Sequence, residues 1–101
     1  MTLEERELAE KTSIVPRRDI DADYYHLSAP DQVLATADLH FQICDTLIEL
    51  SFPVAALEPH LKWELAPKRG SLFPHYYAEL LWQDACTEVQ LERVDGKWVR
   101  A

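Results

Sequence analysis

The chain has 101 residues, which is enough for one domain and too short for two. Hydrophobic residues make up 48% of the sequence, a share that excludes a disordered protein. The formal net charge of −8 repels phosphate backbones and anionic lipids, so we expect no binding to bulk nucleic acid or to a membrane surface.

The cysteines and the apolar segments indicate the cellular compartment of the protein and whether it holds a metal. Cys44 and Cys86 are too few and too far apart for a disulfide framework or a Cys-x-x-Cys site. No apolar run reaches the roughly 18 residues that a membrane-spanning helix needs, and no signal sequence opens the chain. His40 lies four residues before Cys44, a spacing that permits a metal pair but supplies too few ligands for a site. We therefore predict a cytoplasmic protein with free thiols and no metal.

The first half of the chain predicts a helix, a strand, a second helix and a second strand. Residues 3–12 are strong helix formers, and residues 23–27 alternate as in a short strand, with Tyr24 and His26 on one face. Ser28 and Asp31 have capping-box spacing, which predicts a helix that begins at Ser28. Residues 46–52 are mostly apolar, as in a central strand, and a single helical turn follows them.

The second half is richer in strands. Leu61, Trp63 and Leu65 alternate with charged residues, which predicts a half-buried strand over 61–65. Residues 68–77 are predicted as a loop, because glycine and proline punctuate them, although they carry three aromatic residues and a histidine.

The chain ends in a predicted hairpin. One or two helical turns are expected over 80–86 and a strand over 87–94. Asp95 and Gly96 form a strong type I′ turn signal, after which residues 97–99 return as the last strand. The predicted order is α-β-α-β-β-loop-α-β-β, with about five strands.

A first candidate site lies where the strand over 23–27 meets the following helix. Strand ends are where sheets of α/β type collect ligands, so His26 could donate to a ligand oxygen and Ser28 could bind a ribose or phosphate. The alternative is structural: Ser28 caps the helix, and His26 is a packed strand residue.

A second candidate site combines the strand over 61–65 with the aromatic loop. An aromatic loop with a histidine can form a pocket wall that stacks on a planar ring. Trp63 alternates with core positions, so a place in the core is its alternative. The candidates in this group are Trp63, Glu64, Phe73, His75 and Tyr77.

Taken together, these segments closely resemble the domain of unknown function 952 family over about residues 20–94. The most specific part is the run from Ser71 to Tyr77. That family is grouped with the ADP-ribosyltransferase fold, so the resemblance implies an α+β domain with a split, strongly bent, antiparallel or mixed sheet and flanking helices. The single domain over 1–101 would comprise a helix and connector (1–19), a family-like core (20–94) and a return strand (95–101). The motifs that carry the resemblance are Tyr25-His26-Leu27-Ser28, the helix over 31–37, the strand over 47–50, Lys62-Trp63-Glu64 and Leu72-Phe73-Pro74-His75-Tyr76-Tyr77.

The resemblance also implies a ligand. The His-Leu-Ser step is similar to one in RNA 2′-phosphotransferases, where the histidine and serine face the nucleotide. His26 and Ser28 would therefore line a cleft for NAD or a similar nucleotide, with Phe73, His75 and Tyr77 as the stacking wall. The look-alike family has no settled activity, so the resemblance implies no reaction.

Two departures from the family pattern favour a vestigial cleft. Family members usually begin with a strand that supplies a first cleft histidine, whereas here a helix directly follows Met1. Either that strand is lost or the gene start was placed too late. The catalytic glutamate of the transferase fold has no clear match, and Glu64, Glu79 and Glu88 all fit by position. The alternative function is a non-catalytic module that binds a protein or a small ligand.

The missing strand also predicts an open sheet edge. Unpaired backbone N–H and C=O groups on such an edge pair readily with another chain. We expect either that the helix over 3–12 covers the edge and buries Leu3 and Leu8, or that two chains share the edge in a homodimer.

Overall fold

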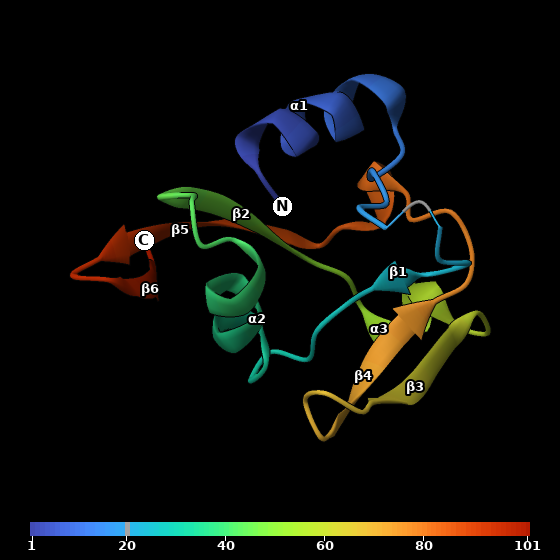
Figure 1. The fold of residues 1–101 in the computed structure, drawn as a ribbon. Helices are drawn as coiled ribbons and strands as arrows, with labels where there is room; N and C mark the ends of the chain where they lie inside the picture. Colours follow the sequence, from blue (N-terminus) through green and yellow to red (C-terminus); the bar gives the residue numbers. More distant parts are fainter. Residues whose placement is uncertain (20) are drawn as a thin grey trace.

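The computed structural model describes residues 1–19 and 21–101. Ile20, where the sequence places the start of the family-like core, lies outside the described residues. The chain forms a small α+β domain with two three-stranded antiparallel sheets, in the strand orders β1-β4-β3 and β2-β5-β6 (Figure 1). The elements are α1 (Leu3–Thr12), β1 (Tyr25–His26), α2 (Val33–His40), β2 (Thr46–Ser51), α3 (Val54–Leu57), β3 (Leu61–Ala66), β4 (Ser71–Tyr76), the 3₁₀ turn η1 (Trp82–Asp84), β5 (Thr87–Val94) and β6 (Lys97–Arg100).

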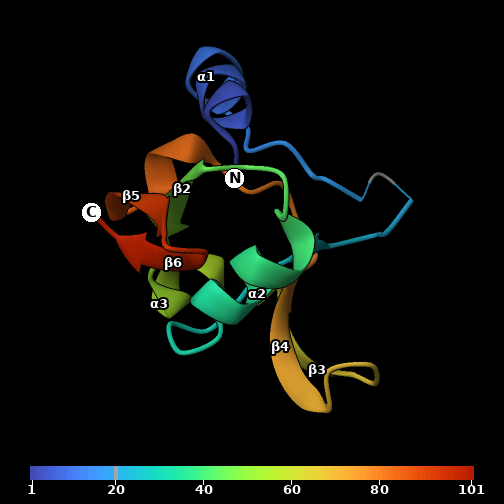
Figure 2. The same ribbon diagram turned by 60° about the vertical axis from the view of Figure 1, so that its left-hand side comes forward.

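Two of the helices contact the sheet β2-β5-β6. Helix α1 contacts β2, and α2 contacts β6. The turn end of the β3–β4 hairpin projects from the body of the domain, as the turned view shows (Figure 2). No helix among the described residues is long and apolar enough to cross a membrane.

Two buried apolar clusters hold the domain together. The first lies behind the sheet β1-β4-β3, and the second lies between α2 and the sheet β2-β5-β6. Burial of each large apolar side chain contributes roughly 1.5–3 kcal/mol to folding. The first cluster comprises Ala9, Val15, Tyr25, Leu57, Tyr76 and Leu80, and the second comprises Ala37, Leu47, Leu91 and Trp98.

The free edge of β2 is met by the first residue of the chain rather than by α1. The Met1 ammonium donates to the carbonyl oxygen of Ile48 at 2.9 Å, and the Ile48 N–H donates to the Met1 carbonyl at 2.8 Å. Leu3 and Leu8 remain largely exposed, so the expectation that α1 buries them over an edge is wrong. The backbone of one residue, and not the apolar stripe of the helix, satisfies this part of the edge.

Residues 71–76 form the strand β4, where the sequence predicted a loop. Proline is tolerated in a strand where its missing N–H is not needed. Pro74 lies opposite Trp63 of β3, and its carbonyl accepts from the N–H of Leu27 on the other side, next to β1. Pro74 offers no N–H on that side, and β1 ends at His26.

Helix α2 begins five residues later than predicted. Ser28 does not cap it, because the Ser28 hydroxyl lies 3.1 Å from the hydroxyl oxygen of Thr36. Instead the Gln32 side chain accepts from the N–H of Ala29 and donates to the carbonyl of Leu72. A turn therefore occupies residues where the capping-box spacing indicated helix.

Other predicted elements agree with the structure. The helix over 3–12, the single turn at Val54–Leu57 and the strand over 87–94 are confirmed. Cys44 and Cys86 are free thiols. The described residues form six strands rather than the predicted five, because β4 was not expected.

The hairpin between β5 and β6 turns at Asp95 and Gly96, both with positive φ (51° and 78°), as a type I′ turn requires. A Cβ at Gly96 would meet no atom within 4 Å, so any cost of a side chain there comes from the backbone alone.

We predict that Gly96→Val destabilises the domain by about 1–2 kcal/mol, because a β-branched residue is strained at positive φ. Thermal unfolding should show the midpoint fall by roughly 4–8 °C for each kcal/mol. Gly96→Asn is the matched control, since asparagine tolerates this conformation and should lower the midpoint much less. Equal midpoints for the two variants would contradict the assigned turn strain.

Candidate functional site

One face of the sheet β1-β4-β3 gathers the polar and aromatic candidates. The register places His26 directly opposite His75, and His75 opposite Lys62. Residues that are directly opposite in antiparallel strands project to the same face. Five side chains meet there and are called the histidine–tyrosine cluster: Tyr24, His26, Glu64, His75 and Tyr77.

The rings of the cluster are in direct contact. Tyr24 stacks on His75 with centroids 4.3 Å apart, and its edge meets His26 at 4.8 Å. The two histidine rings lie 5.2 Å apart at nearly right angles, and Tyr77 lies 5.0 Å from Tyr24. Tyr24 immediately precedes β1 and lies two residues before His26, so both side chains project to the same face of the sheet as His75.

Glu64 links the cluster through hydrogen bonds. Its carboxylate oxygen Oε1 lies 3.0 Å from Nδ1 of His75 and also accepts a short hydrogen bond from the Tyr77 hydroxyl. A carboxylate only accepts, so the bond requires the proton of His75 on Nδ1. In the neutral ring Nε2 is then the acceptor.

These bonds shift two pKa values in opposite directions. The hydrogen bond to Glu64 raises the pKa of Tyr77 to about 12. The bonds from Tyr77 and then His75 lower the pKa of Glu64. Glu64 therefore adds stability above its unfolded pKa that is lost as the pH falls through its folded pKa. Tyr77 adds stability below its unfolded pKa that is lost as the pH rises toward 12.

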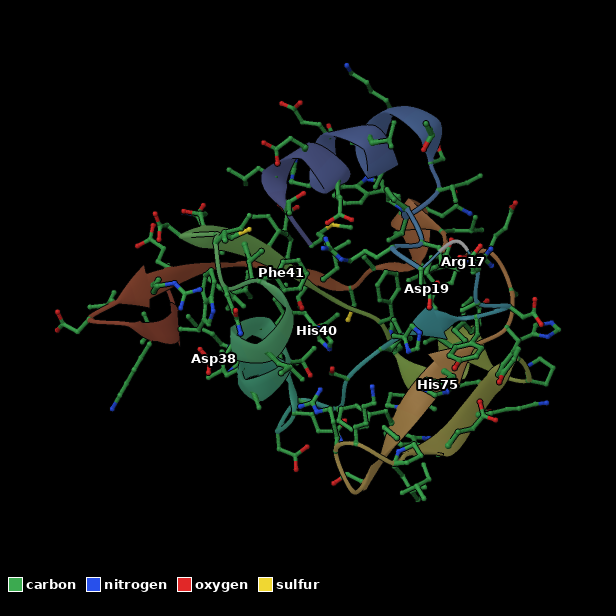
Figure 3. The ribbon with its side chains drawn as sticks, in the orientation of Figure 1. Arg17, Asp19, Asp38, His40, Phe41 and His75 are labelled. Atoms are coloured by element: carbon green, nitrogen blue, oxygen red, sulfur yellow. The ribbon has the colours of Figure 1, made fainter. Side chains whose placement is uncertain are left out.

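The two histidines differ in access to solvent. His75 is only 6% exposed, whereas His26 is exposed and lies 3.7 Å from a carboxylate oxygen of Asp19. Figure 3 shows Asp19 and His75 on the same side of the molecule, where the connector after α1 passes the sheet. A ligand can therefore reach His26 directly, while His75 is held beneath Tyr24.

Ser28 and Phe73 belong to a neighbouring group of contacts. The Ser28 hydroxyl meets Thr36, whose hydroxyl oxygen also accepts from the guanidinium of Arg69 at 2.7 Å. The same guanidinium lies 4.4 Å above the buried ring of Phe73. The predicted stacking residue Phe73 is thus covered by an arginine.

Basic groups gather around the end of α2. Burial, and then the positive charges of Arg69, Arg18 and His26, lower the pKa of His40. Arg18 also forms an ion pair with Glu5 at 2.8 Å. The carboxylates of Glu5 and Asp19 lie beside Arg18 and His26, so these basic groups are partly balanced by acidic ones.

Trp63 is not part of the histidine–tyrosine cluster. It alternates with Lys62 and Glu64 along β3, so it projects to the opposite face of the sheet. It is 50% exposed, and its predicted place in the core is therefore wrong. Of the other glutamates that fit by position, Glu88 forms an ion pair with Arg6 of α1, outside the cluster.

Sequence reasoning did not identify the contacts of Arg18, Arg69 and His40. No spacing signal relates these residues, because they come from the connector, the β3–β4 turn and the end of α2. Tyr24 could have been found from its alternation with His26.

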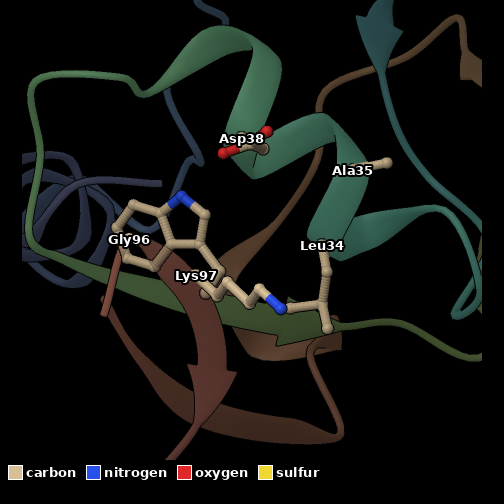
Figure 4. A pocket seen from close by; sticks show the side chains of 6 residues that line it. Leu34, Ala35, Asp38, Gly96 and Lys97 are labelled. Carbon is tan, nitrogen blue, oxygen red and sulfur yellow. The ribbon is translucent and has the colours of Figure 1, made fainter. Parts of the chain in front are cut away.

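Two shallow hollows lie elsewhere on the described surface. One, of about 260 Å³, lies between α2 and β6 (Figure 4). The other lies beside η1 and β5. Neither is lined by a cluster residue, and the described residues contain no group of three or more potential metal ligands. The first hollow is lined by Leu34, Ala35, Asp38, Gly96, Lys97 and Trp98.

Comparisons place the chain among proteins without an assigned activity. The model of a family described as protein of unknown function (DUF952) matches residues 1–89. The chain is similar to the crystal structure of protein CC0527 from Caulobacter crescentus, with 27% identity and a TM-score of 0.85, over 100% of this chain and 89% of that one. A double mutant of the same protein matches with 26% identity, the same TM-score and the same coverage. No curated protein matches the chain.

We predict that the Tyr77 phenol titrates near 12 and that Glu64→Gln lowers its pKa toward the ordinary value of about 10. The neutral amide removes the charged acceptor that favours the protonated phenol. A spectrophotometric titration of tyrosinate measures both values, and Tyr77→Phe, which removes that step, assigns it. An unchanged step in Glu64→Gln would show that the hydrogen bond does not control the phenol.

Proposed function

The chain belongs to the DUF952 family of proteins of unknown function, and we propose that the exposed side of its histidine–tyrosine cluster binds a nucleotide-like small molecule. The observation that carries the proposal is the convergence of His26 and His75, from separate strands, beneath and beside one tyrosine ring. Histidines that serve only packing have no need to meet.

The aromatic part of the cluster supports recognition of a planar ring. Tyr24 is only partly buried, and it is held flat against His75. A side chain that is already immobilised loses little conformational entropy when a base stacks on it. Such a ring offers a pre-organised stacking surface on the exposed side of the histidine–tyrosine cluster.

The basic groups support recognition of phosphate. His26, Arg18 and Arg69 contribute to the field at the end of α2. Each guanidinium has five N–H donors, so the bonds to Glu5 and Thr36 leave donors for an anion. These remaining donors, together with the exposed imidazole of His26, are the groups that would contact a phosphate.

The state of Glu64 argues for binding with weak or absent turnover. Its carboxylate is engaged by His75 and Tyr77, so it orients two side chains and is not a free base. We extend the proposal to NAD as the ligand and to a relationship with the ADP-ribosyltransferase fold. On that view the cleft retains ligand recognition, and its catalytic glutamate is unassigned.

The test is ligand-induced stabilisation of the intact chain by NAD, ADP-ribose and ADP. A bound ligand at 100 times its dissociation constant stabilises the fold by about 2.7 kcal/mol. We predict that His26→Ala weakens binding by roughly tenfold or more, the value of one hydrogen bond to a charged group. His60→Ala is the matched control, because His60 is exposed and its ring packs on Tyr76, outside the cluster.

The outcomes separate binding from catalysis. Stabilisation that is lost in His26→Ala and kept in His60→Ala supports the site. No stabilisation by any of the three ligands, or equal loss in both variants, overturns it. Efficient NAD hydrolysis by the wild-type chain would overturn the assignment of weak turnover while leaving the binding site intact.

A further inference from the structure

Strand β3 has one unpaired side. It hydrogen-bonds with β4, and no other described strand lies beside it in the sheet order β1-β4-β3. Its six residues run without a bulge or a proline. An edge of this kind presents backbone donors and acceptors that can pair with another strand.

The hydrogen-bond pattern shows which residues of β3 direct their backbone N–H and C=O groups toward the open side. The N–H of Tyr77 donates to the carbonyl of His60, which flanks the pair Leu61–Tyr76. That bond makes Leu61–Tyr76 a non-hydrogen-bonded pair, and the alternation makes Trp63–Pro74 another. The N–H and C=O groups of Leu61, Trp63 and Leu65 therefore point away from β4, toward the open side.

The face of the hairpin opposite the cluster is apolar and exposed. Trp63 is 50% exposed, Leu65 is 60% exposed, and Leu72, which lies directly opposite Leu65 on β4, is 54% exposed. The turn end of the hairpin projects from the body of the domain in the turned view (Figure 2), while Gln32 and Thr36 contact it from α2 and the turn before it. Large apolar side chains grouped next to an open edge indicate an interaction surface.

We infer that two copies of this chain pair through β3, antiparallel, with Trp63 opposite the partner's Trp63. This register is symmetric about a twofold axis at the Trp63 pair, and it places Leu61 opposite the partner's Leu65. Leu61, Trp63 and Leu65 are the residues whose backbone N–H and C=O groups point outward. In this register each of them lies opposite another such residue, as hydrogen bonding between the two strands requires. The two sheets β1-β4-β3 become one six-stranded sheet.

Charge complementarity selects a second copy over an unrelated strand. The same register places Lys62 opposite the partner's Glu64, and Glu64 opposite the partner's Lys62, on the face away from the apolar patch. Opposite charges directly across a ladder stabilise the pairing of the two strands. The segment Leu61–Ala66 is thus complementary to itself in charge, in apolar pattern and in backbone phase.

The experiment is sedimentation velocity on the full chain over a concentration series. We predict a reversible monomer–dimer equilibrium that Trp63→Lys weakens at least about tenfold, since it places two like charges on the twofold axis. Ile43→Lys is the matched control: it changes net charge equally at a residue that is 97% exposed and lies outside β3, and it should leave the equilibrium unchanged. Unfolding curves for each variant show whether the fold is retained.

A second variant tests the register. Lys62→Glu places a glutamate opposite the partner's Glu64 and should weaken the dimer, with the difference from wild type shrinking at high salt. A chain that stays monomeric at all concentrations overturns the inference. A dimer that resists both Trp63→Lys and Lys62→Glu, or that Ile43→Lys disrupts equally, overturns it too. None of these outcomes depends on nucleotide binding, so the two proposals fail separately.

Discussion

The pairing of β1 with β4 is the constraint on which the candidate site depends. β1 has two residues, so the ladder alone is weak, yet it sets His26 opposite His75. The buried neighbour Tyr25 anchors it: its ring packs in the first apolar cluster, and its hydroxyl donates to the Val15 carbonyl at 2.7 Å. The burial of Tyr25 therefore fixes β1, and the adjacent residue His26 projects to the other face of the sheet, opposite His75.

Much of this arrangement could be predicted from local sequence pattern. The alternation of Tyr24 and His26 indicated a shared face, and the Asp95–Gly96 turn followed from the backbone freedom of these residue types. The start of α2 could not be predicted, because the capping-box spacing at Ser28 matches a true helix start, whereas the Ser28 hydroxyl meets Thr36 instead. A local rule cannot show which of two partners a side chain meets in the folded chain.

The sequence predicted neither the strand β4 nor the exposure of Trp63, and the physical reasons differ. Pro74 suggested a loop because proline lacks a backbone N–H. Whether a strand tolerates it depends on whether the neighbouring strand needs that donor, which the sequence does not show. Trp63 suggested core, because alternation reveals that a strand has two faces but not which of them is covered. Likewise, Arg69 meets Thr36 and Phe73 through contacts that no spacing along the chain encodes.

The hairpin of β3 and β4 has a different chemistry on each face. Toward the cluster it presents Glu64 and His75, joined by a hydrogen bond and neighbouring two tyrosines. On the reverse face it presents Trp63, Leu65 and Leu72, each about half exposed. An ordinary half-buried strand has one face covered by the core, whereas β3 is partly exposed on both of its faces. The alternation of apolar and charged residues in β3 is typical of a strand that covers a core. Here the same alternation gives a strand whose two faces are available for separate contacts.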